Sequence, residues 1–169
     1  GAAARVNPGF ETGTFDGWTV VGLEEHEFPF VTSHIDGDDE FNAFNPYSYD
    51  APFGKYFAVI PGGYDNRTNY ITQKFSGDKG DIISGKAAFV AIDYFPWDDS
   101  AKIEVLEGGT VLYQKSISST SDTSTPWSPF SYVLPHSGTF TIKASSTNDY
   151  DAACPSSFLL VDTAEVCTT

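Results

Sequence analysis

Aromatic and acidic side chains occur together in several short segments, a combination that suits the binding of sugar rings. Flat rings cover the apolar C–H side of a sugar, and carboxylates accept hydrogen bonds from its hydroxyls. The densest segment, residues 93–99, contains Tyr94, Trp97 and Asp99. We expect these three side chains to lie at the tip of a hairpin and to contact a ligand.

Three further segments offer the same groups. Tyr47 and Tyr49 belong to the second, Tyr64 to the third, and Trp127, flanked by prolines, to the fourth and weakest. The alternative for any single ring is that it caps an open end of the fold. If Tyr47, Tyr49 and Trp97 converge, they form a platform, whereas scattered rings leave the chain without a binding site.

The usual catalytic signatures are missing. The sequence has no Gly-x-Ser-x-Gly, no His-Glu-x-x-His, no phosphate-binding glycine loop and no Cys-x-x-Cys. His26 and His34 are eight residues apart, but Pro29 interrupts the segment, so we expect surface or core-edge histidines. A glycosidase needs two nearby carboxyl groups, but 23 acidic residues provide such pairs by chance, for example Asp98 or Asp99 with Glu104, so their presence is weak evidence for an enzyme. We expect a non-enzymatic protein, with a polysaccharide lyase or glycosidase as an alternative.

Length and charge limit the classes of binding partner that we expect. The 169 residues suit one domain, and a net charge of −14 repels nucleic acid and anionic lipid. No apolar run reaches the roughly 18 residues that a membrane span needs, so we expect no membrane insertion. One explanation for the excess of acidic residues is solubility in an extracellular medium. The alternative explanation is that some carboxylates converge on a divalent cation.

Short runs of alternating apolar and polar residues predict strands, and helical spacing is almost absent. The expected strands are 18–21, 28–35, 56–60, 70–75, 87–95, 102–106, 110–117, 130–134, 139–144 and 158–166.

The segments between these runs read as turns and loops. Gly108 and Gly109 supply the positive φ of a two-residue hairpin, and residues 135–138 separate another pair of strands. Residues 36–53 form the longest irregular segment, and residues 116–125 should be an exposed loop. The whole pattern predicts an all-β fold, a two-sheet antiparallel sandwich.

An acidic run within the irregular segment does not match a calcium-binding hand loop. It contains Asp36, Asp38, Asp39 and Glu40 but lacks the glycine and glutamate that such a loop needs at its sixth and twelfth positions. A solvated loop is the default interpretation, and a second, loosely held cation is the alternative.

Two features favour export. Cys154 and Cys167 flank a strand-like segment, so a disulfide between them is geometrically plausible and would contribute about 3 kcal/mol, with free thiols as the alternative. Asn66 begins an Asn-Arg-Thr triplet, the acceptor pattern for N-glycosylation. We expect a secreted protein whose residues 1–4 are a flexible remnant, any leader having been removed.

The opening residues 7–18, NPGFETGTFDGW, resemble the first strand of the carbohydrate-binding-module and galactose-binding-like jelly rolls. Residues 51–57, 137–142 and 158–166 resemble later strands of that family in the same order. The resemblance implies one jelly-roll domain over residues 5–167 and a buried position for Trp18 between the sheets.

The family also implies a structural calcium ion near the two ends of the domain. By position, Glu11 and Asp162 would provide carboxylates, and carbonyls near Gly9 and Lys55 would complete the shell, as calcium prefers. Thr163 stands where many relatives have a second acidic residue. The alternative is that Glu11 and Asp162 only accept hydrogen bonds from the backbone.

The sequence therefore predicts an extracellular, lectin-like module that binds a glycan through loop aromatics. An adhesive or structural module that contacts a protein partner through the same loops is the alternative.

Overall fold

The computed structural model describes residues 6–22, 28–37, 46–62, 67–90, 99–117, 124–147 and 157–163. These residues form twelve strands and no helix, so the described part of the chain contains no helix that could cross a membrane.

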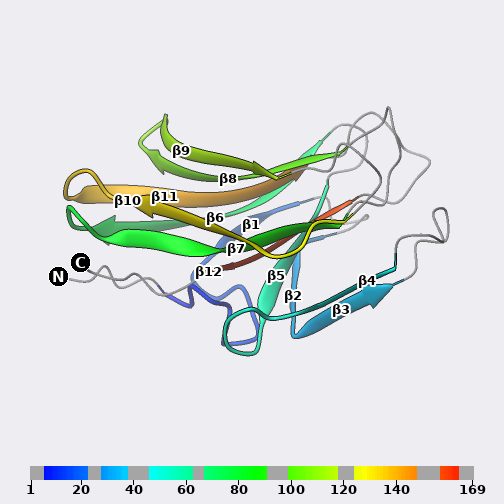
Figure 1. Ribbon diagram of the computed structural model, residues 1–169. Helices are drawn as coiled ribbons and strands as arrows, with labels where there is room; N and C mark the ends of the chain where they lie inside the picture. Colours follow the sequence, from blue (N-terminus) through cyan, green and yellow to red (C-terminus); the bar gives the residue numbers. More distant parts are fainter. Residues whose placement is uncertain are drawn as a thin grey trace.

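Two five-stranded antiparallel sheets lie face to face (Figure 1). Sheet A consists, in spatial order, of β1 (Thr19–Val21), β6 (Thr68–Gly77), β11 (Gly138–Thr147), β8 (Ser100–Glu107) and β9 (Thr110–Ile117). Sheet B consists of β10 (Ser128–Val133), β7 (Ile82–Val90), β12 (Phe158–Thr163), β5 (Phe57–Pro61) and β2 (Phe30–Thr32). A separate hairpin pairs β3 (His34–Gly37) with β4 (Tyr47–Asp50). The predicted all-β sandwich of jelly-roll type is confirmed.

The main core fills the space between the two sheets. Alternate residues of sheet B, among them Ile60, Phe89 and Leu159, meet Ile103 and Ile142 of sheet A in one buried cluster. Because side chains alternate along a strand, the neighbours of these residues point away from sheet A.

Sheet B is apolar on its outer face as well. Phe57, Val59 and Leu160 form a second buried cluster there, together with Ala88 and Val90. The β3–β4 hairpin lies on that side of sheet B and covers it (Figure 1). A central strand that is covered on both faces reads as a continuous apolar run, and all five residues of β5 are buried.

Two of the expected elements were placed wrongly in the 28–53 region. The run 28–35 is divided at Ser33, where the Thr32 hydroxyl donates to the His34 carbonyl and makes a turn. The segment 36–53 is not irregular throughout, because β3 extends to Gly37 and Tyr47–Asp50 forms β4. Tyr47 and Tyr49 alternate with polar residues, a period-two pattern whose apolar side rests on sheet B.

The Gly108–Gly109 hairpin is confirmed. Gly108 has a φ of +61°, and Glu107 pairs with Thr110 across the turn. The connection at residues 135–138 is also present, but β10 belongs to sheet B and β11 to sheet A, so it crosses between the sheets. Strand β9 continues to Ile117, and residues 118–123 of the expected loop lie outside the described residues.

Close packing beside Gly85 in β7 gives a test of the fold. A Cβ there would lie 2.4 Å from the carbonyl oxygen of Asp162 and 2.5 Å from Cζ of Phe130. We predict that Gly85→Ala lowers the free energy of unfolding by about 1–3 kcal/mol. Gly109→Ala is the matched control, since a Cβ there meets nothing within 4 Å, and should change it by less than about 0.5 kcal/mol. Equal effects in urea denaturation would contradict the packing of β7 against β12.

Candidate functional site

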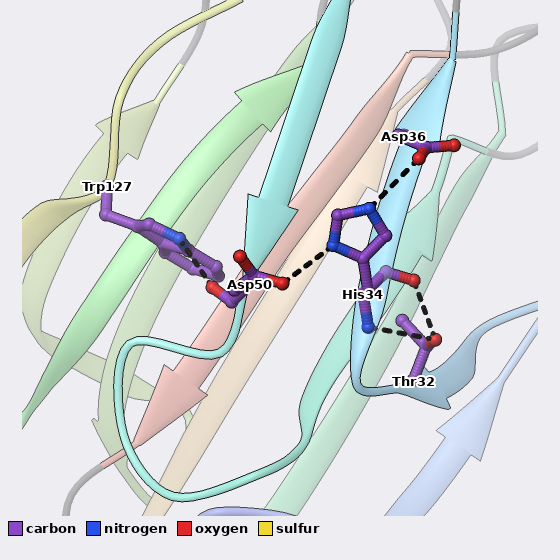
Figure 2. Close-up of polar contacts among 5 residues, drawn as sticks. All are labelled: Thr32, His34, Asp36, Asp50 and Trp127. Atoms are coloured by element: carbon purple, nitrogen blue, oxygen red, sulfur yellow. Dashed lines mark hydrogen bonds and ion pairs between the residues drawn. The ribbon is translucent and has the colours of Figure 1, made fainter.

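Three ionisable side chains meet on the outer face of the β3–β4 hairpin. His34 Nδ1 lies 2.7 Å from Asp50 Oδ1, and His34 Nε2 lies 3.0 Å from Asp36 Oδ2 (Figure 2). Strand register explains the arrangement: His34 and Asp50 are cross-strand partners, and Asp36 lies two residues along β3, on the same face. Both ring nitrogens of His34 therefore face a carboxylate.

The inner face of the same hairpin is apolar. Tyr49, the cross-strand partner of Ile35, is 9% exposed, and its hydroxyl donates to the carbonyl of Thr125. Gly37 leaves room for the ring of Tyr47, because a Cβ at Gly37 would lie 2.6 Å from the Tyr47 hydroxyl. Burial raises the pKa of Tyr49. These contacts attach the hairpin to sheet B and so fix the position of the charged face.

Trp127 borders the charged face. Its indole N–H donates to the backbone carbonyl of Asp50 over 3.0 Å, which Figure 2 shows beside His34. The ring meets Phe57 and Tyr49 edge to face, with centroids 5.4 and 5.9 Å away. Thr125 holds the segment before Trp127 onto β7. Trp127 is half-buried, so part of its surface remains in solvent.

We call His34, Asp36, Asp50 and Trp127 the hairpin site. The side chains of Asp36 and Asp50 are 70% and 84% exposed, and that of His34 is 41% exposed. An exposed carboxylate accepts hydrogen bonds from hydroxyls, and an indole beside it covers an apolar ring face. The hairpin site thus brings together the two kinds of group that suit a sugar.

The predicted ligand residues do not form one platform within the described residues. Tyr47 is half-buried and packs edge to face against Phe158, with ring centroids 6.5 Å apart. Asp99 is 2% exposed and accepts a hydrogen bond from the Ser157 N–H, so it has a structural role. Together with Tyr49, these side chains serve packing.

The remaining predicted residues lie outside the described residues. They are Tyr64, Tyr94 and Trp97, the glycosylation candidate Asn66, and the cysteines Cys154 and Cys167.

Sequence reasoning missed the grouping of the hairpin site. The sequence pattern ranks Trp127 last among the candidate rings. It predicts His34 at the surface or core edge, where the side chain does lie. The available signal was the alternation of Tyr47 and Tyr49 with Ser48 and Asp50, which predicts a strand opposite His34.

A second group of polar atoms lies where the first described segment meets the last strand. Glu11 accepts a hydrogen bond from the Lys55 N–H at 2.7 Å, and Asp162 accepts one from the Phe53 N–H at 3.3 Å. Asp162 is completely buried, and its Oδ1 has no hydrogen-bond partner among the described residues. Burial, with a smaller contribution from the charge of Glu11, raises the pKa of Asp162 to about 8.

Two glycines let the backbone approach these carboxylates. A Cβ at Gly9 would lie 3.2 Å from the Thr163 carbonyl oxygen and 3.5 Å from Asp162 Oδ1. A Cβ at Gly54 would lie 1.4 Å from Glu11 Oε1, and Gly54 has a φ of +60°. The Asp162 carboxylate and the Thr163 carbonyl thus lie beside Gly9, and the Glu11 carboxylate lies beside Gly54.

This donor set fits a hard cation such as calcium. Its oxygens are carboxylate and carbonyl, and the unpartnered Oδ1 of Asp162 is the kind of buried oxygen that a cation would coordinate. Among the described residues, no three His, Cys, Asp or Glu side chains gather into a metal site, so main-chain or water oxygens would have to complete the shell. We call Glu11 and Asp162 the carboxylate pair.

Trp18 packs near the same segment. Its ring lies 5.0 Å from that of Phe10, and its indole N–H donates to the Asn7 carbonyl over 2.9 Å. The ring packs against the main core but stays half-buried, at the rim of the sandwich rather than fully between the sheets.

Comparison with solved structures identifies the fold of this chain. No protein-family model and no curated protein matches the sequence. Among solved structures, a family 61 carbohydrate-binding module in complex with β-1,4-galactotriose matches with a TM-score of 0.57. It is 17% identical, and the match covers 96% of each chain. The chain has the fold of carbohydrate-binding modules.

Two more structures share this fold. One, reported for carbohydrate-binding modules of the β-sandwich superfamily, is 13% identical over 98% of this chain and 63% of that one, with a TM-score of 0.51. The K1 cleaved adhesin domain of Lys-gingipain from Porphyromonas gingivalis W83 is 12% identical over 100% and 99% of the two chains, with a TM-score of 0.58. The resemblance noted in the sequence is thus confirmed for the fold.

The two carboxylates beside His34 lead to a prediction about its pKa and about the pH dependence of stability. Hydrogen bonds to Asp50 and then to Asp36 raise the pKa of His34 above its ordinary 6.5. Because the folded-state pKa is raised, the stabilisation is complete below the unfolded-state pKa and is lost as pH rises through the folded-state value. We expect an NMR titration of His34 to give a pKa above 6.5, and a lower one in Asp50→Asn. A wild-type pKa at or below 6.5 would contradict the paired geometry.

Proposed function

We propose that this chain is an extracellular, non-catalytic carbohydrate-binding module that holds a glycan at the hairpin site. The observation that carries the proposal is the half-buried indole of Trp127 next to Asp50. The exposed carboxylate of Asp50 is joined through His34 to that of Asp36. The shared fold with a module solved with β-1,4-galactotriose supports it. Tyr64, Tyr94 and Trp97 stay predicted ligand contacts. Asn66 and the cysteine pair stay predicted signs of export.

The rigid support of Trp127 strengthens the proposal. Its indole N–H is held by the Asp50 carbonyl, and its ring rests on Phe57. A ring fixed in this way loses little conformational freedom when a ligand stacks on it, so more of the contact energy contributes to affinity. Exposed carboxylates at the same edge give the site hydrogen-bond specificity.

Glycan binding tests the proposal. We predict that the protein binds a subset of neutral oligosaccharides on an array, and that Trp127→Ala weakens this binding about tenfold, corresponding to about 1.4 kcal/mol. Asp50→Asn should also weaken it without disturbing the core, since that side chain is exposed. Val133→Ala, an exposed change on β10, is the control.

Three results would count against glycan binding at the hairpin site. They are a blank array, binding that survives both Trp127→Ala and Asp50→Asn in folded protein, and binding lost only in Trp97→Ala. Release of reducing sugar or of an unsaturated product from polysaccharides would favour the enzyme alternative.

We also propose that the carboxylate pair binds a structural calcium ion. Glu11 and Asp162 would provide carboxylate oxygens, and main-chain carbonyls near Gly9 and Lys55 would complete the shell. The Oδ1 atom of Asp162 supports this assignment, because a buried carboxylate oxygen without a hydrogen-bond partner is unfavourable. Bound calcium would supply the missing positive charge and tie the first segment to β12.

Thermal unfolding with and without calcium tests the metal. At a calcium concentration 100-fold above Kd we expect about 2.7 kcal/mol of stabilisation, a rise in Tm of about 5–10 °C over the protein in chelator. Asp162→Asn should abolish the rise. In chelator this variant should be at least as stable as wild type, because it removes a carboxyl whose burial is unfavourable, as its raised pKa indicates. The same Tm with calcium and chelator, or an equal rise in Asp162→Asn, would contradict the assignment.

A protein-binding role has separate support. Val21, Phe28 and Phe30 are 38–43% exposed, and Phe28 packs near Gly22, just after β1. Exposed apolar side chains that lie together are typical of protein-interaction surfaces. Binding to a protein partner that is lost in Phe28→Ser with Phe30→Ser, with no glycan bound, would favour this adhesive alternative.

A further inference from the structure

The outer face of sheet A is polar and carries positive charge. Since Phe140, Ile142 and Ala144 point into the main core, the residues that alternate with them on β11, such as Lys143 and Ser145, point outward. The same alternation on β6 and β8 places further lysines on this face. The outward lysines are Lys74, Lys102 and Lys143.

This charge contrasts with the rest of the molecule. The chain has a net charge of −14 and only nine Lys and Arg residues. Three of these nine lie on one sheet face, where Glu104 is the one acidic side chain that points outward from the described strands. The two lysines next to Glu104 are Lys102 and Lys143, so this local group has a net charge of +1, from two positive charges and one negative.

The group is ordered by strand register. Lys143 pairs with Glu104, and Lys102 Nζ lies 3.7 Å from Glu104 Oε1. The ammonium of Lys143 also lies 4.3 Å from the centre of the Tyr70 ring. Glu104 is 4% exposed, so its charge is directed to the lysines rather than to solvent.

A pocket of about 250 Å³ opens directly beside this group. Two cross-strand rows form its walls: Ser145 pairs with Lys102, which pairs with Ser116, and Thr147 pairs with Ser100. Ligand pockets for drug-sized molecules usually start at about 300 Å³, so this pocket suits one small polar unit. The lining combines hydroxyl-bearing residues from three strands with Lys102.

We propose that this pocket binds a carboxylated sugar unit, a hexuronate, as a second glycan site on the face opposite the hairpin site. Serine and threonine hydroxyls donate to and accept from the ring hydroxyls, and Lys102 pairs with the carboxylate. A single negative charge on the ligand matches the local net charge of +1. This site adds to the proposed function but does not depend on the hairpin site.

The experiment compares glucuronate with glucose, which differ only in the carboxylate at C6. Backbone amide shifts of the ¹⁵N-labelled full chain report both affinity and location. We expect glucuronate to shift the amides of residues 100–102, 116 and 145–147 saturably, and to bind at least fivefold more tightly than glucose. Lys102→Gln should weaken glucuronate binding about tenfold. Lys79→Gln, which removes the same charge from the turn after β6, should change it less than twofold.

The outcomes separate this inference from the proposed function. Equal shifts with both sugars, shifts confined to the hairpin site, or equal effects of Lys102→Gln and Lys79→Gln would overturn the uronate pocket and leave the hairpin site intact. Glucuronate binding that depends on Lys102 but survives Trp127→Ala would support the pocket even if no neutral glycan binds. Ser145→Ala is a second, uncharged variant, which should weaken both glucuronate and glucose if the hydroxyl wall contacts the ring.

Discussion

The double-sided burial of sheet B is the constraint on which the rest of the structure depends. Strands β5, β7 and β12 have apolar side chains on both faces, so two sheets alone would leave Phe57, Val59 and Leu160 in water. Each such exposure would cost roughly 1.5–3 kcal/mol. The β3–β4 hairpin removes this cost by covering the outer face. Because the hairpin has only one face left for solvent, His34, Asp36 and Asp50 gather there, and the hairpin site follows from packing.

The same constraint explains why Asp162 is unusual. Strand β12 is apolar from Phe158 to Val161 and then places a carboxylate in a position that is fully buried. Such a position suits an apolar residue, and burial there raises the pKa of Asp162 to about 8. Natural chains break local rules of this kind mainly where a function compensates. Glu11 and the backbone around Gly9 lie at the one place where a cation would compensate.

The parts of the fold set by local patterns could be predicted from the sequence. Period-two alternation placed strands such as β9, and Gly108 with Gly109 placed the β8–β9 turn, because both signals act within a few residues. Strand β4 was missed for a physical reason. Tyr47 and Tyr49 fit a solvent-exposed platform as well as a buried hairpin face, and only the distant apolar surface of sheet B decides between them. Neither the burial of Asp99 nor the rows that line the sheet A pocket could be read from sequence, because both need contacts and register between distant segments.

The charged face of the β3–β4 hairpin and the outer face of sheet A carry opposite local charge, although the chain as a whole is strongly acidic. The hairpin face carries Asp36 and Asp50, while the outer face of sheet A carries Lys102 and Lys143. Packed sheets lie about 10 Å apart, and the Debye length at physiological ionic strength is about 8 Å. Carboxylates on one face are therefore largely screened at the other, so each face presents its own local charge to a ligand. An acidic protein can in this way hold an anionic sugar at one face through short-range contacts, although its net charge repels anions at long range.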